Sequence, residues 1–224
     1  MVNILNTANG DLFVFEGLDG TGKTTISKEF SAYLSSIGKK CRNFSFPGNS
    51  SGTLGKHIYE IHHELSEVGI TTINPTSLQM LHVASHIDAI ESEILPELRA
   101  GNSIVLDRFW WSTIVYGSVY GANSDSLNKL IEIEKMHWAE FQPACIFYLK
   151  RQNTLKPFGV KHWDELLEAY EILVQQESNS SRIELITYES SPQDALAQII
   201  EVYENITKEN RNQEMSSRSI SSEL

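Results

Sequence analysis

The apolar residues of this chain follow two alternating patterns. Short, nearly continuous apolar runs are typical of strands buried on both faces, and they occur at residues 12–16, 40–46, 104–107, 144–149 and 183–188. Apolar residues at helical spacing lie between and after them, over residues 23–37, 54–65, 76–100, 110–120, 124–141, 163–176 and 192–207. Strands that alternate with helices predict an α/β fold of three layers, with helices on both faces of a five-stranded parallel sheet.

The patterns also predict the domain organisation. No internal repeat and no second set of strands is visible, so residues 1–207 are expected to form a single domain. A chain of 224 residues is long enough to bury a full core. From residue 208 onward the sequence is polar, rich in serine and without periodicity. We therefore predict a flexible polar tail over residues 208–224.

Composition narrows the partners and the compartment. The formal net charge is −11, whereas a surface that follows a nucleic-acid backbone needs clustered Lys and Arg, so we expect no nucleic-acid partner. No apolar run approaches the length of a membrane span, and residues 1–10 do not resemble a signal peptide. The two cysteines, Cys41 and Cys145, fit no metal-binding spacing. We expect a cytoplasmic protein with reduced thiols and no membrane partner.

A glycine-rich turn joins the first predicted strand to the first predicted helix. Residues 17–24 read G-x-x-x-x-G-K-T, which is the Walker A phosphate-binding loop. In such a loop, Gly20 and Gly22 let backbone N–H groups point inward at an anion. The charge of Lys23 lies between the β- and γ-phosphates, and the hydroxyl of Thr24 can ligate Mg²⁺. The motif predicts that the chain binds a nucleoside triphosphate.

Asp107 and Arg108 give a second chemical signal, because they end the third predicted strand. Triphosphate binding alone leaves three classes open: a small-molecule kinase, a regulatory switch and a motor-type ATPase. An acid at the end of a buried strand is well placed for Mg²⁺ or its bound water, and the neighbouring arginine can meet phosphate oxygens with two N–H groups. The alternative for Asp107 is that it caps the following helix.

Four motifs resemble those of the thymidylate kinase family, in the same order. They are FEGLDGTGKTT at residues 15–25, FPGNSSGTLGK at 46–56, LQMLHVASHIDAIESEILPELRAGNSIVLDR at 78–108 and LDRFWWSTIVYG at 106–117. The resemblance covers roughly residues 12–150. It implies a P-loop nucleoside monophosphate kinase fold that uses ATP and Mg²⁺, with an acceptor site and a lid at about residues 150–163. It also implies a homodimer formed through the long helices.

The resemblance implies roles for individual residues. ATP and Mg²⁺ would be held by the loop residues Gly17, Asp19, Gly20, Thr21, Gly22, Lys23, Thr24 and Thr25. Asp107 would lie near the metal, and Arg108 would bridge the transferring phosphates. On the acceptor side, Asp19 would accept a hydrogen bond from the sugar 3′-hydroxyl and Phe46 would wall the base pocket. Tyr116 would lie under the sugar, where its ring disfavours a 2′-hydroxyl.

Three residues depart from the family's acceptor site. His86 stands where the family has an arginine, Asp88 where it has a base-reading polar residue, and His82 where it has an aromatic one. The Pro47–Gly48 turn also lacks the family's neighbouring arginine. Each lost arginine–phosphate contact removes a charge-assisted hydrogen bond worth about 1.5–3 kcal/mol. Either these residues still bind an acceptor, or His82 and His86 are simply two partly exposed helix histidines.

The cation that stabilises the transition state is expected from the lid. Family members with a glycine at the position of Gly20 usually supply it from an arginine-rich lid, and such a cation can raise phosphoryl transfer by about 10³–10⁵. Here the segment contains Lys150, Arg151, Lys156 and Lys161. Arg151 is our first candidate, and the alternative is a solvated basic loop.

Three functions therefore stay open. The first is ATP-dependent phosphoryl transfer to a deoxynucleoside monophosphate, as in a dTMP kinase, giving the diphosphate and ADP. The second is a kinase of nucleosides, or of a modified or non-thymine nucleotide, for which Glu16 or Asp19 is the nearby candidate base. The third is a catalytically weak nucleotide-binding protein. Glu132 and Glu134, by contrast, have the pattern of a solvated helix face.

Overall fold

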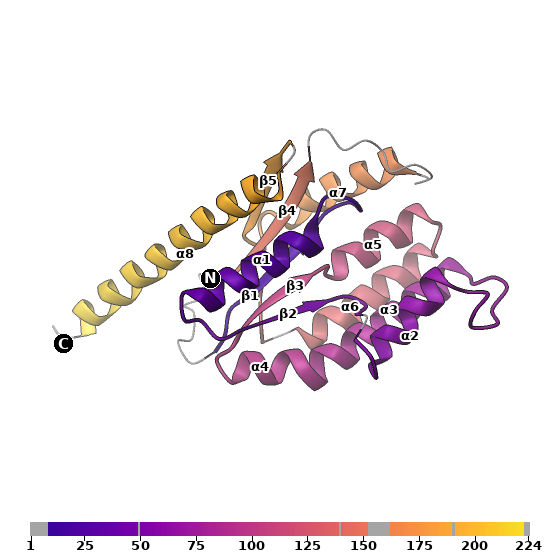
Figure 1. The fold of residues 1–224 in the computed structure, drawn as a ribbon, viewed down its shortest axis with the longest axis horizontal. Coiled ribbons are helices and arrows are strands. Elements are labelled where there is room, and N and C mark those ends of the chain that lie inside the picture. The colour runs from indigo at the N-terminus through magenta and orange to yellow at the C-terminus, as the bar shows by residue number, and fades with distance from the viewer. Residues whose placement is uncertain (1–8, 49, 139, 152–161, 190, 222–224) are drawn as a thin grey trace.

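Five strands form one sheet in the computed structural model, which describes residues 9–48, 50–138, 140–151, 162–189 and 191–221, with side chains to residue 212. The strands are β1 (Leu12–Glu16), β2 (Cys41–Ser45), β3 (Ser103–Asp107), β4 (Cys145–Arg151) and β5 (Ile183–Tyr188). All their pairings are parallel, and their order is β2-β3-β1-β4-β5 (Figure 1). The predicted five-stranded parallel sheet is confirmed.

Helices connect the strands and cover both faces of the sheet (Figure 1). In chain order they are α1 (Lys23–Ser36), α2 (Leu54–His63), α3 (Pro75–Ala89), the π-helical turn η1 (Ile90–Ile94), α4 (Leu95–Arg99), α5 (Trp110–Val119), α6 (Ser124–His137), α7 (Trp163–Glu177) and α8 (Pro192–Ser221). In the part of the chain that the structure describes, no helix is long and apolar enough to cross a membrane.

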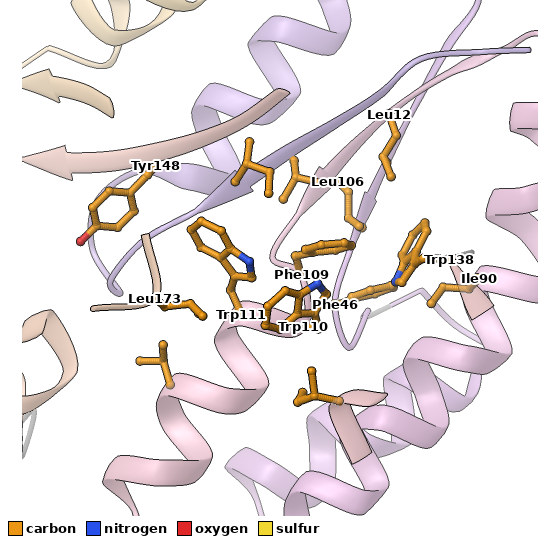
Figure 2. Packing of buried hydrophobic residues seen from close by; sticks show 14 of the residues in the cluster. Leu12, Phe46, Ile90, Leu106, Phe109, Trp110, Trp111, Trp138, Tyr148 and Leu173 are labelled. Atoms are coloured by element: carbon orange, nitrogen blue, oxygen red, sulfur yellow. The ribbon is translucent and has the colours of Figure 1, made fainter. Parts of the chain in front are cut away.

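The central strand β1 contributes to two separate cores. Leu12 and Val14 point to the face covered by α4, α5, α6 and α7, whereas Phe13 and Phe15 point to the face covered by α1 and α8. This alternation explains why β1 reads as a continuous apolar run, since every residue of the strand is buried. Figure 2 shows the first core, in which the indole rings of several tryptophans pack against the sheet.

The predicted helix over residues 76–100 is interrupted by one wider turn. Residues 90–94 form η1 between α3 and α4, and Pro96 follows at the start of α4. Proline has no N–H to donate to the carbonyl of Ser92, and its ring would collide with that carbonyl. A π-type turn before the proline relieves this conflict while the chain keeps its direction.

Helix α8 is longer than its apolar pattern predicts. Its buried apolar residues end at Ile206, near the predicted end at Thr207, but the helix continues to Ser221. The segment predicted as a flexible polar tail is therefore helical as far as residue 221, and its flexibility stays a prediction. No glycine or proline occurs after Pro192 to stop the helix, and Arg182 forms an ion pair with Glu209 beyond the last buried turn.

The core under α1 generates a stability prediction. Phe30 is fully buried, and its ring lies within 5.4–5.8 Å of the rings of Phe13, Phe15, Phe147 and Tyr203. We expect Phe30→Ala to lower the free energy of unfolding by about 3–5 kcal/mol, measured by urea denaturation, because the change removes these contacts and leaves a cavity. The control Leu185→Ala, at a side chain 56% exposed, should cost about 0.5 kcal/mol. Equal losses in the two variants would contradict this packing.

Candidate active site

The loop between β1 and α1 has the geometry of a phosphate-binding loop. Gly17 has a φ of 140°, and a Cβ atom there would lie 2.5 Å from the backbone oxygen of Leu149 on β4. Gly22 has a φ of 76° and immediately precedes the first residue of α1. Both positions therefore require glycine. The loop leads directly into the helix N-terminus, where free N–H groups and the helix dipole favour an anion.

Lys23 is the first residue of α1, and its side chain folds back over the loop. Its Nζ donates a hydrogen bond to the backbone oxygen of Leu18 at 2.7 Å, and the residue is buried. Burial lowers the pKa of Lys23 to about 8, and the nearby Arg108 cation acts in the same direction. A bound phosphate group would favour the charged ammonium.

Asp107 lies next to the loop because of the sheet register. β1 and β3 are paired so that Phe15 is opposite Asp107. The hydroxyl of Thr24 donates to Asp107 Oδ2 at 2.5 Å, while Asp107 Oδ1 is buried and lacks a hydrogen-bond partner among the described residues. The alternative role of Asp107 as a helix cap is wrong, because Phe109 occupies the N-cap position of α5.

Asp19, Arg108 and Tyr116, to which the family resemblance assigns site roles, lie together at the mouth of the loop. Arg108 forms an ion pair with Asp19, and the Tyr116 hydroxyl donates to the second carboxylate oxygen of Asp19 at 2.9 Å. Burial opposes ionisation of Asp19, but the Arg108 and Lys23 cations lower its pKa below the ordinary value. The guanidinium of Arg108 also lies 5.5 Å from the centre of the Tyr116 ring.

Glu16 has a role that the sequence reasoning missed. It is fully buried, and one carboxylate oxygen accepts hydrogen bonds from the N–H groups of Phe109 and Ser112, at 2.7 Å and 3.0 Å. Glu16, at the end of β1, therefore caps the N-terminus of helix α5. Burial raises its pKa above the ordinary value. The sequence signal for this role was the single acidic residue at the end of an otherwise apolar strand, which suggests a buried carboxylate with hydrogen-bond partners.

The residues predicted to line the acceptor base form a buried aromatic wall. Phe46 stacks on His86, with ring centres 4.1 Å apart and an angle of 9° between the planes. His86 Nδ1 lies 3.0 Å from Glu134 Oε2, and His82 Nε2 lies 3.1 Å from His62 Nδ1. Both His82 and His86 are buried, so the reading as partly exposed helix histidines is wrong. Glu134 is also fully buried, which corrects its assignment to a solvated face.

His82 and His62 supply little positive charge to an acceptor. Burial lowers the pKa of His82 to about 2 and that of His62 to about 4, so both rings are neutral at pH 7. His86 faces the carboxylate of Glu134. Asp88 is exposed and lies two residues further along α3, so the structure does not bring it to the wall formed by Phe46 and His86.

The lid candidates fall partly outside the described residues. Lys156 and Lys161 lie there, while Lys150 and Arg151 end β4. Lys150 pairs with Glu171, and Arg151 Nε donates to the backbone oxygen of Glu189 at 3.2 Å. Both basic residues line a cavity of about 260 Å³ that also contacts Leu18 and Thr21 of the loop.

The remaining predicted loop residues, Gly20, Thr21 and Thr25, differ in burial. Thr21 is buried, its hydroxyl donates to the backbone oxygen of Leu18 at 2.8 Å, and its own carbonyl accepts a hydrogen bond from Tyr188. Gly20 and Thr25 are exposed on either side of the loop. The structure thus groups the donor-side residues as predicted and the acceptor-side residues in part.

The fold and this site define a P-loop nucleotide kinase. Residues 15–178 match the family model described as thymidylate kinase. A thymidylate kinase of Thermosipho africanus is 30% identical over 168 residues, which are 74% of this chain and 80% of that protein. A thymidylate kinase of Mesoplasma florum is 29% identical, over 88% of this chain and 98% of that protein.

Solved structures agree on the fold. The thymidylate kinase of Ehrlichia chaffeensis superposes with a TM-score of 0.71 at 19% identity, covering 87% of this chain and 99% of that one. The thymidylate kinase of Candida albicans superposes with a TM-score of 0.64 at 22% identity, covering 90% of this chain and 93% of that one. The chain belongs to the thymidylate kinase family, and it is an ATP-dependent nucleoside monophosphate kinase.

The lowered pKa of Lys23 predicts a pH dependence of nucleotide binding. Bound phosphate favours the ammonium form, which the free protein loses as the pH rises through about 8. The affinity for ADP should therefore fall above pH 8, approaching about tenfold per pH unit, when measured by calorimetry between pH 7 and pH 9.5. The variant Lys23→Met should bind weakly with no such slope. An equal slope in both proteins would assign the titration to another group.

Proposed function

We propose that this protein transfers the γ-phosphoryl group of ATP to dTMP, giving dTDP and ADP. The observation that carries the proposal is the cluster of Asp19, Arg108 and Tyr116 beside the phosphate-binding loop. It places a hydrogen-bond acceptor, a fixed cation and an aromatic ring within one short stretch of the site. These three features suit a deoxyribose 5′-phosphate, which presents a hydroxyl, a sugar face and an anion.

The donor side consists of the loop and the start of α1. Backbone N–H groups of residues 17–24 surround the phosphates. The nucleotide-binding residues within and next to this range are Asp19, Gly20, Thr21, Gly22 and Thr25. Lys23 leaves the carbonyl of Leu18 and binds the β- and γ-phosphates, exchanging one hydrogen bond for a stronger charged one. The protein supplies position and charge to a direct in-line transfer.

Thr24 and Asp107 are the proposed ligands of Mg²⁺. The buried, unpartnered Oδ1 of Asp107, identified among the described side chains, fits a hard cation or its bound water. Thr24 Oγ1 already lies 2.5 Å from the same carboxylate. No cluster of three or more His, Cys, Asp or Glu side chains suited to a metal occurs in the described residues. When bound, Mg²⁺ neutralises charge on the transferring group.

The acceptor side is formed by Asp19, Tyr116, Arg108 and Phe46. Asp19 accepts a hydrogen bond from the sugar 3′-hydroxyl, and the Tyr116 ring excludes a 2′-hydroxyl. Arg108 bridges the two reacting phosphates after it gives up part of its pairing with Asp19. Phe46, His82 and His86 form the base wall. The exposed position of Asp88 gives no support to a base-reading role.

The organisation of the protein is part of the proposal. We infer a cytoplasmic protein with a single kinase domain over residues 1–207, which acts as a homodimer and binds no nucleic acid. Exposed apolar side chains on α3 and α6 support the dimer; they are Met80, Ile133 and Met136, with Met136 72% exposed. The charge of −11 supports the absence of a nucleic-acid partner.

The substrate is tested by ADP release over all nucleosides and nucleoside monophosphates. We expect dTMP to give the highest kcat/KM, with ribonucleotides rejected by Tyr116. Faster turnover of thymidine than of dTMP would instead identify a nucleoside kinase, which the neutral His62–His82 pair would favour. Turnover of another monophosphate would identify a different base. ATP binding without turnover of any acceptor would identify a nucleotide-binding protein.

Arg151 is the proposed cation of the transition state. Its position at the end of β4, lining the cavity next to Leu18 and Thr21, supports this role. We expect Arg151→Ala to lower kcat by about 10³, with little change in the dissociation constant of ATP, because the cation acts on charge that develops during transfer. Lys150→Ala is the matched control and should lower kcat far less, since Lys150 pairs with Glu171. Unchanged turnover of Arg151→Ala would exclude it.

A further inference from the structure

A buried network of oxygen atoms joins helix α7 to the active site. Its centre is Glu16 Oε2, which accepts hydrogen bonds from the Ser112 hydroxyl at 2.9 Å and from the Tyr170 hydroxyl at 3.0 Å. The Ser112 and Tyr170 oxygens are themselves 3.0 Å apart. Ser112 Oγ accepts a hydrogen bond from Arg108 Nη1 at 3.0 Å. The hydroxyl of Tyr170 is therefore two contacts from the Arg108 guanidinium.

Tyr170 is a residue of α7 that the proposed reaction does not otherwise use. It is fully buried, and its ring packs against Tyr148 with centres 5.7 Å apart. Burial raises the pKa of Tyr170 well above its ordinary value, so the hydroxyl keeps its proton and can donate it. A phenylalanine would fill the same space but would leave Glu16 Oε2 without this donor.

Glu16 is a buried anion close to two cations. Its neighbours are hydrogen-bond donors: the N–H groups of Gly17, Phe109 and Ser112 and the two hydroxyls. Such a shell suits the ionised carboxylate, which only accepts. Burial raises the pKa of Glu16 above the ordinary value, while the nearby Arg108 and Lys23 cations act in the opposite direction, so a charged Glu16 attracts them. Yet Arg108 pairs with Asp19, and Lys23 donates to Leu18.

The neutral hydrogen-bond donors around Glu16 keep the Arg108 guanidinium from binding its carboxylate. A carboxylate oxygen whose lone pairs are already occupied competes poorly for a further charged donor. Loss of one neutral donor would free Glu16 Oε2 to attract Arg108 away from the phosphates. Arg108 is sensitive to this pull because its φ of 73° is a strained conformation for a residue with a side chain, which persists only while surrounding contacts define it.

We propose that Tyr170 is a positioning residue for phosphoryl transfer. Its hydroxyl occupies Glu16 Oε2 and braces Ser112, so that the guanidinium of Arg108 stays directed at the reacting phosphates. This inference rests on the proposed bridging role of Arg108. It extends the active site to Tyr170 of α7.

The direct test is Tyr170→Phe, which removes one hydroxyl and keeps the ring. We expect kcat for dTMP to fall about tenfold, which corresponds to about 1.4 kcal/mol. The KM of ATP should change less than twofold, because the loop binds ATP without this network. The matched control is Tyr203→Phe, at a buried tyrosine in the core under α8, and it should leave kcat and KM unchanged.

A double-mutant cycle with Ser112→Ala separates positioning from a general loss of stability. If Tyr170 acts through Ser112 and Glu16, the double variant should be about as slow as Ser112→Ala alone. The proposal would be overturned if the effects of the two substitutions on kcat multiply independently, or if Tyr170→Phe leaves kcat unchanged. It would also be overturned if the Tyr170→Phe protein does not fold. In the last case the hydroxyl would hold the fold rather than Arg108.

Affinity for a bisubstrate inhibitor separates this proposal from the proposed function. Adenosine and thymidine joined through five phosphates span both halves of the site without turnover. Tyr170→Phe should bind this compound about tenfold more weakly, whereas its affinity for ADP should be unchanged. If the wild-type protein binds the compound but does not phosphorylate dTMP, the function fails and the positioning role can still be measured. Equal affinity of wild type and variant overturns the positioning role alone.

Discussion

The pairing of β1 with β3 is the constraint on which the rest of the site depends. Their register sets Phe15 opposite Asp107, so the loop that follows β1 and the Asp107–Arg108 pair that follows β3 emerge side by side. Thr24 then reaches Asp107, Arg108 reaches Asp19, and Glu16 reaches the first turn of α5. Each of these contacts joins segments that are far apart in sequence. None of them would form if the two strands were shifted by one residue, because the side chains would then face opposite sides of the sheet.

The two cations of the site are held by partners within the protein. Lys23 is bonded to a carbonyl of its own loop, and Arg108 is paired with Asp19. In the proposed mechanism these contacts are exchanged for contacts with phosphate oxygens, and part of the binding energy is used in that exchange. Such an arrangement keeps buried charges satisfied in the absence of nucleotide. In the proposed mechanism it also connects the two halves of the site, because the carboxylate proposed to bind the sugar hydroxyl is the one that pairs with Arg108.

The sequence predicts much of this arrangement because the responsible signals are local. Apolar periodicity identifies the five strands, the glycine spacing identifies the loop, and an acid at a strand end identifies Asp107. The rest depends on contacts between distant segments. Glu134 is buried against its partner His86, which lies on another helix. Glu16 lies on β1 but caps helix α5, which follows β3. The extension of α8 beyond Ile206 could not be predicted from periodicity, since a helix without a buried face carries no apolar pattern.

We propose that the loop and the Asp19–Arg108–Tyr116 cluster carry out direct phosphoryl transfer to dTMP. The most direct measurement is a single turnover with ATP labelled at the γ-phosphate, excess enzyme and dTMP, stopped at short times. We expect the label to pass from ATP to dTDP in one kinetic phase, with an equal amount of ADP and no label on the protein. Label that appears on the protein, or as inorganic phosphate while dTMP remains unchanged, would contradict it.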